Sequence, residues 1–330
     1  MDIIMPNKFL NRKGITIKKQ KYRVGNWSEY NEALKRRGDI EIWLSLAVID
    51  NWYNEDRKYD GTGAPELYTK LAITTCHEIR KVFRLPLRQT EGFINSLFRM
   101  KGLNIRCPSY SELSKRLKML HIKCPKYCRK DVPEKDIVSI AIDSTGLKRF
   151  GRDEWHQEKY NISGKRSWRK LHVAVDDKHY IQGCELTSRF THDEKVVADI
   201  VAQIKISVDH YSADGAYDNN DVYQILANNF PHAAIVIPPR KGAVYHENNH
   251  AERNRNIAEI KLGYGGHMGW QKRRNYGRRN YSELSIQRYK RILGNALQSR
   301  EFSNQKQEAM ISCGVLNKMT SLGMPKSYRI

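Results

Sequence analysis

The stretch IVSIAIDSTG, residues 137–146, is the most informative part of this sequence for its fold. It is short, rich in β-branched and apolar residues, and ends in Asp-Ser-Thr-Gly, which predicts a buried strand with a polar end. Asp143 is therefore expected where that strand ends. An Asp before Ser-Thr-Gly is often only a turn former, so its meaning depends on what surrounds it.

The residues that follow predict an α/β sheet. WRKLHVAVDD (168–177) and HYIQGCELTS (179–188) form an expected hairpin with Asp176, Asp177 and Lys178 at its turn. Further strands are expected within 207–218, which closes on a turn, and at 233–239. Helices are expected after a capping box at Thr191–Glu194, at 221–230 and at about 282–297. Residues 240–270 are a polar, glycine-rich stretch with no assigned element. This order matches the ribonuclease-H-like arrangement, a mixed five-stranded sheet with helices.

The residues upstream, from about 26 to 130, show helical periodicity instead. Ser109-Tyr-Ser-Glu112 is a capping box that opens a helix. In that helix Leu113, Leu117 and Leu120 are expected to face inward, and Lys115, Arg116 and Lys118 to face out. Short helices with a basic second member suit a helix-turn-helix, but an ordinary basic helix gives the same pattern. Both alternatives stay open at this point.

Positive charge gathers at the two ends of the chain. Lys and Arg number 58 against 36 Asp and Glu. Residues 1–150 carry 30 basic and 17 acidic side chains, residues 151–250 carry 12 and 14, and residues 251–330 carry 16 and 5. A solvated surface of mixed sign predicts an even distribution, whereas a polyanion partner predicts local surpluses. DNA is therefore the expected partner, in preference to a membrane surface.

The remaining composition points to a cytoplasmic, nucleoid-associated protein. No apolar run approaches the roughly 18–20 residues of a membrane span, and the amino terminus lacks the apolar core of a signal peptide. Six scattered cysteines suit a reducing compartment and are expected to be free buried thiols. A zinc site made of Cys107, His121, Cys124 and Cys128 is the weaker alternative, because the set lacks a second closely spaced pair.

Three acidic residues stand at the ends of predicted elements. Asp143 ends the first strand, Asp214 ends the fourth, and Glu283 opens the late helix. Each has an ordinary explanation, as a turn former or as a partner of the helix dipole. Glu283 is nevertheless the only acid between Lys261 and Arg300, a segment that contains many basic residues, Arg273 and Arg274 among them. Together three such carboxylates provide the hard oxygen ligands that two divalent ions about 3.5–4 Å apart need to cut a phosphodiester.

The late helix also carries a family pattern. Tyr276, Arg279, Glu283 and Lys290 stand as Y-x2-R-x3-E-x6-K, which resembles the DDE transposases of the insertion sequence four and five superfamily. IAIDSTGLK around Asp143 and SADGAYD around Asp214 resemble the same family. The upstream segments NWSEYNEALKRRGDIEIW, LPLRQTEGFINSLFRMKGL and PSYSELSKRLK look like its insertion sequence five group. The likeness covers about residues 25–300 and is loosest between Pro239 and Trp270. Asn219 stands where the family more often has Thr.

The resemblance implies roles for single residues. Asp143, Asp214 and Glu283 would form the metal-binding triad for two Mg²⁺ or Mn²⁺ ions. Tyr276, Arg279 and Lys290 would contact DNA phosphates near the cleaved bond. Arg273, Arg274 and the basic side chains of residues 115–118 are further expected DNA contacts. Trp270 is expected to be packed inside the fold, although stacking on an unpaired base is an alternative.

We expect four regions along the chain. They are a basic N-terminal arm (1–25), an all-α DNA-binding domain (26–132), the ribonuclease-H-like catalytic domain (133–300) and a C-terminal tail (301–330). The expected activity is metal-dependent cleavage at the terminal inverted repeats of an insertion sequence, followed by joining of the 3′-hydroxyl ends to target DNA by a homodimer or larger assembly. The alternatives are a ribonuclease-H-like nuclease without strand transfer and a transposase-derived DNA-binding regulator.

Overall fold

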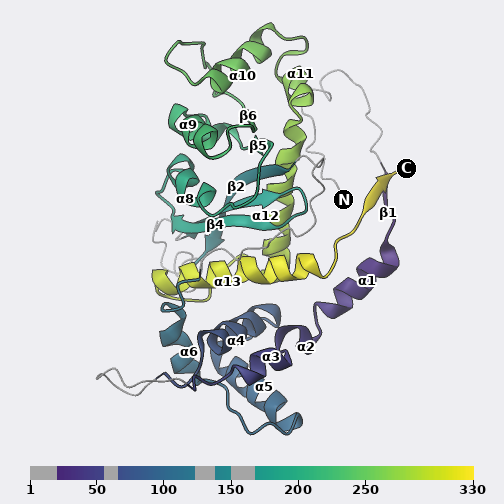
Figure 1. Ribbon diagram of the computed structural model, residues 1–330, viewed down its shortest axis with the longest axis vertical. Helices are drawn as coiled ribbons and strands as arrows, with labels where there is room; N and C mark the ends of the chain where they lie inside the picture. Colours follow the sequence, from purple (N-terminus) through teal and green to yellow (C-terminus); the bar gives the residue numbers. More distant parts are fainter. Residues whose placement is uncertain (1–20, 56–65, 123–137, 150–167) are drawn as a thin grey trace, which may run out of the picture. The chain divides into compact units, whose positions relative to one another are not determined.

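The computed structural model describes residues 21–55, 66–122, 138–149 and 168–330 (Figure 1). The chain divides into two compact units, one made of residues 1–42 with 318–330 and the other of residues 43–317. Among the described residues no helix has both the length and the apolar character needed to cross a membrane.

In the smaller unit the first described residues pair with the C-terminal residues. β1 (Tyr22–Val24) pairs antiparallel with β7 (Ser327–Arg329), and α1 (Trp27–Arg36) follows β1. Asn26 ties the same ends together, since its amide donates to the Met324 carbonyl (3.1 Å) and its side-chain oxygen accepts from the Lys326 N–H (2.7 Å). Part of the segment that the sequence left as a tail is therefore a strand. α2 (Ile40–Trp43) follows α1.

The larger unit begins with helices, as the periodicity predicted. They are α3 (Leu46–Asp50), α4 (Lys70–Val82), α5 (Leu87–Met100) and α6 (Tyr110–Leu117). The predicted cap is confirmed, because the Ser109 hydroxyl accepts from the Glu112 N–H at 3.2 Å. Leu113, Leu117 and Leu120 are buried as predicted.

The orientation predicted for Arg116 is wrong. Its side chain is 9% exposed and reaches inward, where it donates to the Tyr68 carbonyl (2.6 Å) and to the Glu66 carboxylate (2.6 Å). Local periodicity does not reveal this, because both partners come from a segment about fifty residues earlier. An Arg can cover apolar surface with its stem and still pair its head group.

The predicted mixed five-stranded sheet is confirmed. Its order is β4-β3-β2-β5-β6, in which β2, β3 and β4 are antiparallel and β2, β5 and β6 are parallel. The strands are β2 (Ser139–Lys148), β3 (Trp168–Asp176), β4 (Ile181–Ser188), β5 (His210–Ser212) and β6 (Ala234–Val236). The β3–β4 turn forms at the predicted place, where the Asp176 carboxylate accepts from the backbone N–H groups of Lys178 and Tyr180.

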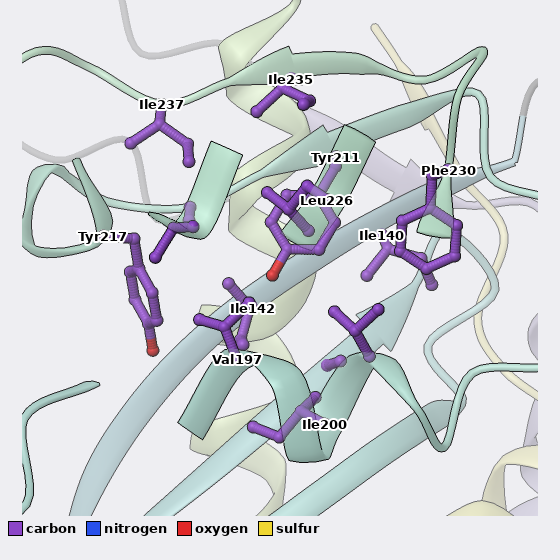
Figure 2. Close-up of a cluster of buried hydrophobic side chains, with 14 of the residues drawn as sticks. Ile140, Ile142, Val197, Ile200, Tyr211, Tyr217, Leu226, Phe230, Ile235 and Ile237 are labelled. Atoms are coloured by element: carbon purple, nitrogen blue, oxygen red, sulfur yellow. The ribbon is translucent and has the colours of Figure 1, made fainter. Parts of the chain in front are cut away.

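One face of this sheet carries the apolar core. Ile140 and Ile142 of β2 point to α8 (Val197–Val201) and α9 (Asn220–Asn229), where Ile200 and Leu226 join them without exposure to solvent (Figure 2). Because successive strand residues face opposite sides, Asp143 points to the other face. On that face α12 (Asn280–Leu293) contacts β2 and β3. Because the side chains of β2 alternate between the two faces of the sheet, Asp143 points away from the cluster that contains Ile140 and Ile142.

The capping box predicted after β4 was wrong. Thr191 does not cap a helix: η2 (Asp193–Val196) starts after His192, which makes no side-chain cap, and α8 is only five residues long. The stretch 240–270, to which the sequence analysis assigned no element, holds α10 (Ala251–Leu262) and most of α11 (Gly266–Arg273). Asn256 of α10 is fully buried and accepts from Trp270 Nε1 (3.2 Å), so the inner face of α10 is partly polar.

The end of the larger unit is also helical. η4 (Tyr276–Arg279) leads into α12, which ends at Gly294 with φ of 100°, a conformation that favours glycine. α13 (Phe302–Ser321) then runs through residues that the sequence placed in a tail. Its Ala309, Cys313 and Leu316 are completely buried.

Candidate active site

Asp143 lies on β2 just beyond the point where the pairing of β2 with β5 ends. The parallel pairing of β2 with β5 stops at Ala141, whereas its antiparallel pairing with β3 continues to Lys148. Asp143 is thus inside the strand rather than at its end, but it lies just beyond the last residue that β5 covers. Its carboxylate is 18% exposed and accepts from the Ser144 N–H at 2.8 Å.

Asp214 lies where β5 gives way to a turn. It caps η3 (Gly215–Tyr217), and its carboxylate accepts from the Ala216 N–H at 2.9 Å. A Cβ at Gly215 would lie 3.2 Å from the Pro238 carbonyl, so the turn passes tightly against the loop after β6. The ends of the parallel strands β2 and β5 therefore bring Asp143 and Asp214 to the same edge of the sheet.

The loop after Asp214 is held by an ion pair that sequence reasoning missed. Asp218 is buried, and both of its oxygens accept from the Arg253 guanidinium of α10 at 2.8 and 3.0 Å. Asn219, which stands where the family more often has Thr, caps α9 by accepting from the Asp221 N–H. The only sequence signal for the Asp218 pair was an Asp just after a turn.

Glu283 enters from the first turn of α12, where Arg279 links it to Asp143. The Arg279 Nη1 lies 3.4 Å from the Asp143 Oδ2, and its Nη2 pairs with the Glu283 carboxylate one helical turn away. The Arg279 side chain is 14% exposed. Asp143 of β2 and Glu283 of α12 thus share one cation, although Arg279 stands 136 positions after Asp143 in the chain.

Burial and nearby carboxylates raise the pKa of Asp143 above that of an ordinary aspartate. Burial raises the pKa of Asp143 to about 6; Arg279 and the Ser144 hydrogen bond oppose that rise, and the charges of Asp214 and Glu283 add to it. Burial likewise raises the pKa of Tyr276 to about 12, and the same three carboxylates contribute. The three predicted acids therefore stand close enough to sense one another, with Tyr276 and Arg279 beside them.

The donor set suits hard divalent cations, but the carboxylates are not gathered into a metal cage. In the described part of the chain no three acidic, His or Cys side chains converge within metal-binding range. The Arg279 guanidinium lies between Asp143 and Glu283 and neutralises them instead. Carboxylate oxygens are the hard ligands that Mg²⁺ and Mn²⁺ prefer, so the types of residue present fit such ions.

A second charged cluster borders Asp143 and was not anticipated from the sequence. Asp193 accepts from Lys170 Nζ at 2.8 Å and from the Ser144 hydroxyl at 2.9 Å. Its carboxylate also lies 3.8 Å from His172, which is fully buried. These bonds position η2 against β2 and β3. The predicted capping box does not form there, and the Thr191 hydroxyl lies 3.3 Å from the Ser188 hydroxyl instead.

The other predicted DNA-contacting residues divide into two groups. Lys290 lies on α12 seven residues after Glu283, about 10 Å further along the same helix face. Arg273 instead donates to the carbonyls of Tyr264 and Glu259, and Arg274 pairs with the Glu252 and Glu259 carboxylates. Both arginines thus hold α10 against α11.

Residues of the helical segment lie apart from the carboxylates. Lys115 is exposed, and Lys118 lies 3.6 Å from the Glu301 carboxylate. Trp270 is fully buried, which confirms the packed interpretation. Four cysteines are free and buried, as predicted, and Cys107 lies 3.8 Å from Cys76. Cys124 and Cys128 of the alternative zinc set lie outside the described residues.

A mixed sheet whose edge presents acidic side chains beside an Arg is the arrangement of ribonuclease-H-like proteins. Comparison with known families agrees with this class. A family model described as "Transposase DDE domain" matches residues 134–318, more than half of the chain, and a second model of the same description matches residues 35–152. The chain belongs to the DDE transposase family, whose members act on DNA and generally use divalent metal ions.

Proposed function

We propose that this chain is a transposase of the insertion sequence four and five superfamily, within its insertion sequence five group. It would bind the terminal inverted repeats of its element, cleave there and join the 3′-hydroxyl ends to target DNA. The observation that carries the proposal is the single cation shared by Asp143 and Glu283, with the charge of Asp214 close enough to raise the pKa of Asp143.

In this proposal Asp143, Asp214 and Glu283 hold two Mg²⁺ or Mn²⁺ ions. When bound, such ions activate the attacking hydroxyl and stabilise the leaving oxygen. Arg279 pairs with the carboxylates in the absence of DNA and turns to a phosphate of the transposon end when DNA arrives. Its guanidinium suits both partners, because each accepts two parallel hydrogen bonds. Tyr276 and Lys290 provide further phosphate contacts on the same side.

The remaining regions receive the roles expected from the sequence. The helical segment within 26–132 would bind the repeats, with Lys115 as a contact from α6. The catalytic domain would span 133–300. Two protomers or more would hold both ends of the element together, because joining requires both ends at one target.

Two isosteric variants test the catalytic assignment. Asp143→Asn and Glu283→Gln are expected to lower metal-dependent cleavage of a plasmid carrying the element's ends by at least about a thousandfold, while binding of end DNA stays near wild type. Glu247→Gln is the matched control, because Glu247 is an exposed acid. Normal nicking by Asp143→Asn would contradict the assignment. If the wild-type chain cleaves DNA without giving joined products, it is a nuclease. If it binds DNA without any cleavage, it is a regulator.

A further inference from the structure

A basic cavity lies in the larger unit and shares no residue with the carboxylate site. Its volume is about 730 Å³, within the range of ligand pockets. The first turns of α5 and α6 line one part of it, and residues 298–304, which lead into α13, line another. Four cations also line it: Arg80, Arg88, Lys115 and Arg300.

Arg80 is the most informative of these residues. It is 5% exposed, and its side chain makes no hydrogen bond and no ion pair with any described residue; its Nε is buried without a partner. Glu308 is the nearest acid that acts on it, but the Glu308 carboxylate already pairs with Lys81 and accepts from the backbone N–H groups of Gln298 and Ser299. A buried guanidinium without a bonded partner is costly, which indicates that an anion completes it.

The surroundings of Arg80 favour an anion as well. α5 begins after Pro86 without a side-chain cap and without an acid in its first turn, so its first N–H groups and the positive end of its dipole remain available. Arg88 lies over the Tyr110 ring at 4.5 Å, and neither Lys115 nor Arg300 forms an ion pair with a described residue. Glu301, the one acid lining the cavity, lies 3.6 Å from Lys118.

We infer that this cavity binds a phosphate group, carried either by a DNA backbone or by a free phosphate-bearing molecule. Several N–H donors around one point and a planar guanidinium match the oxygens of a phosphate. The volume leaves room for the sugar attached to it. The inference that the phosphate belongs to DNA rests on the proposed function. The inference that the cavity binds a phosphate group does not.

Inorganic phosphate tests the shared chemistry. It is expected to raise the melting temperature of the wild-type chain above that in chloride of equal ionic strength, because it binds the folded state alone. Arg88→Gln and Arg300→Gln should require about tenfold more phosphate for the same shift, since each removes a charge-assisted contact. Both side chains are exposed, so neither substitution threatens folding. Arg80→Gln should abolish the shift. Arg99→Gln, at the far end of α5 and exposed, is the matched control and should behave as wild type.

The salt dependence of DNA binding identifies the source. If a backbone phosphate enters the cavity, Arg88→Gln and Arg300→Gln should each lower the slope of log K against log salt by about one, whereas Arg99→Gln leaves it unchanged. Unchanged slopes together with a lost phosphate response would assign the site to a free phosphate-bearing molecule. If the cavity variants match Arg99→Gln in both assays, the inference is overturned. Asp143→Asn should keep both responses, so a failure of the catalytic proposal is distinguishable from a failure here.

Discussion

Arg279 determines the state of the carboxylate site at the scale of single residues. It brings a positive charge between two acids that would otherwise repel each other across a partly buried gap. The sequence pattern placed Arg279 one helical turn before Glu283 but did not reveal its contact with Asp143, because that contact joins residues 136 positions apart. The sequence analysis placed all three acids at element ends, which holds for Asp214 and Glu283 but not for Asp143, which lies inside β2. It did not predict that Asp143 and Glu283 share a counter-ion.

Replacing Arg279 by an uncharged residue should make the stability of the fold depend on added divalent metal ions. Arg279→Gln is expected to lower the free energy of unfolding in EDTA by roughly 1–3 kcal/mol, because two partly buried carboxylates lose their cation. Mg²⁺ should then raise the melting temperature of the variant more than that of wild type. Lys272→Gln changes an exposed cation nearby and serves as the control. An identical Mg²⁺ response in wild type and Arg279→Gln would show that the carboxylates do not share a cation site.

Asp218 provides a second prediction, about structure alone. Its side chain is fully buried and pairs with Arg253 through both oxygens. Asp218→Asn should therefore lower the free energy of unfolding by about 1–3 kcal/mol, since it removes the charge partner of a partly buried guanidinium and replaces one accepting oxygen by a donor. Urea denaturation measures the change. Asp221→Asn, at an exposed position in the same segment, should cost less than about 1 kcal/mol by weakening only a helix-dipole contact. If both variants lose the same free energy of unfolding, the Asp218–Arg253 ion pair does not stabilise the fold as argued.

At the scale of elements, the sequence predicted the helices and strands whose buried residues are mostly apolar. The five strands and α9 show clear periodicity because each buries one side, or both sides, in apolar surroundings. α10 escaped detection because its buried positions include Asn254 and Asn256. α13 escaped for the opposite reason: buried residues occur on several sides of it, so no stripe stands out.

The contact between α8 and β4 gives a prediction at this scale. A Cβ at Gly183 would lie 2.8 Å from the Ile200 carbonyl, closer than real Cβ atoms approach backbone oxygens. Gly183→Ala should therefore force α8 away from β4 and lower the free energy of unfolding by about 1–3 kcal/mol. Gly92→Ala is the matched control, because Gly92 lies inside α5 with nothing within 4 Å of its added Cβ. It should raise stability by about 0.5–1 kcal/mol. Unchanged denaturation midpoints in Gly183→Ala would contradict this packing.

At the scale of the whole molecule, the uneven distribution of charge is the property that sequence alone predicts best. Counting residues places basic surpluses in 1–150 and 251–330 but does not say which side chains are available. Arg116, Arg273 and Arg274 hydrogen-bond to or pair with other residues of the fold, whereas Arg88, Lys115 and Arg300 line the phosphate cavity. Net charge thus predicts the class of partner, and only the fold separates structural cations from binding ones.

Buried histidines should make the folded state sensitive to mild acid. Burial lowers the pKa of His77 and of His172 to about 4, so both stay neutral in the folded chain near pH 7. In the unfolded chain a histidine takes up its proton near pH 6.5. Between pH 6.5 and 4 the unfolded state therefore binds more protons, and stability falls as the pH falls; above pH 6.5 these groups have no such effect.

His77 allows this effect to be isolated. Its Nε2 lies 3.1 Å from the Leu113 carbonyl, a bond that a glutamine amide can also donate. Between pH 7 and pH 5 the wild-type chain should lose stability, and His77→Gln should lose roughly 2 kcal/mol less, because one histidine that protonates only on unfolding is gone. Urea midpoints at the two pH values measure the difference. His232→Gln, at an exposed position, should follow wild type. If His77→Gln loses as much as His232→Gln, the His77 ring is protonated inside the fold, and the acid sensitivity must arise from other groups.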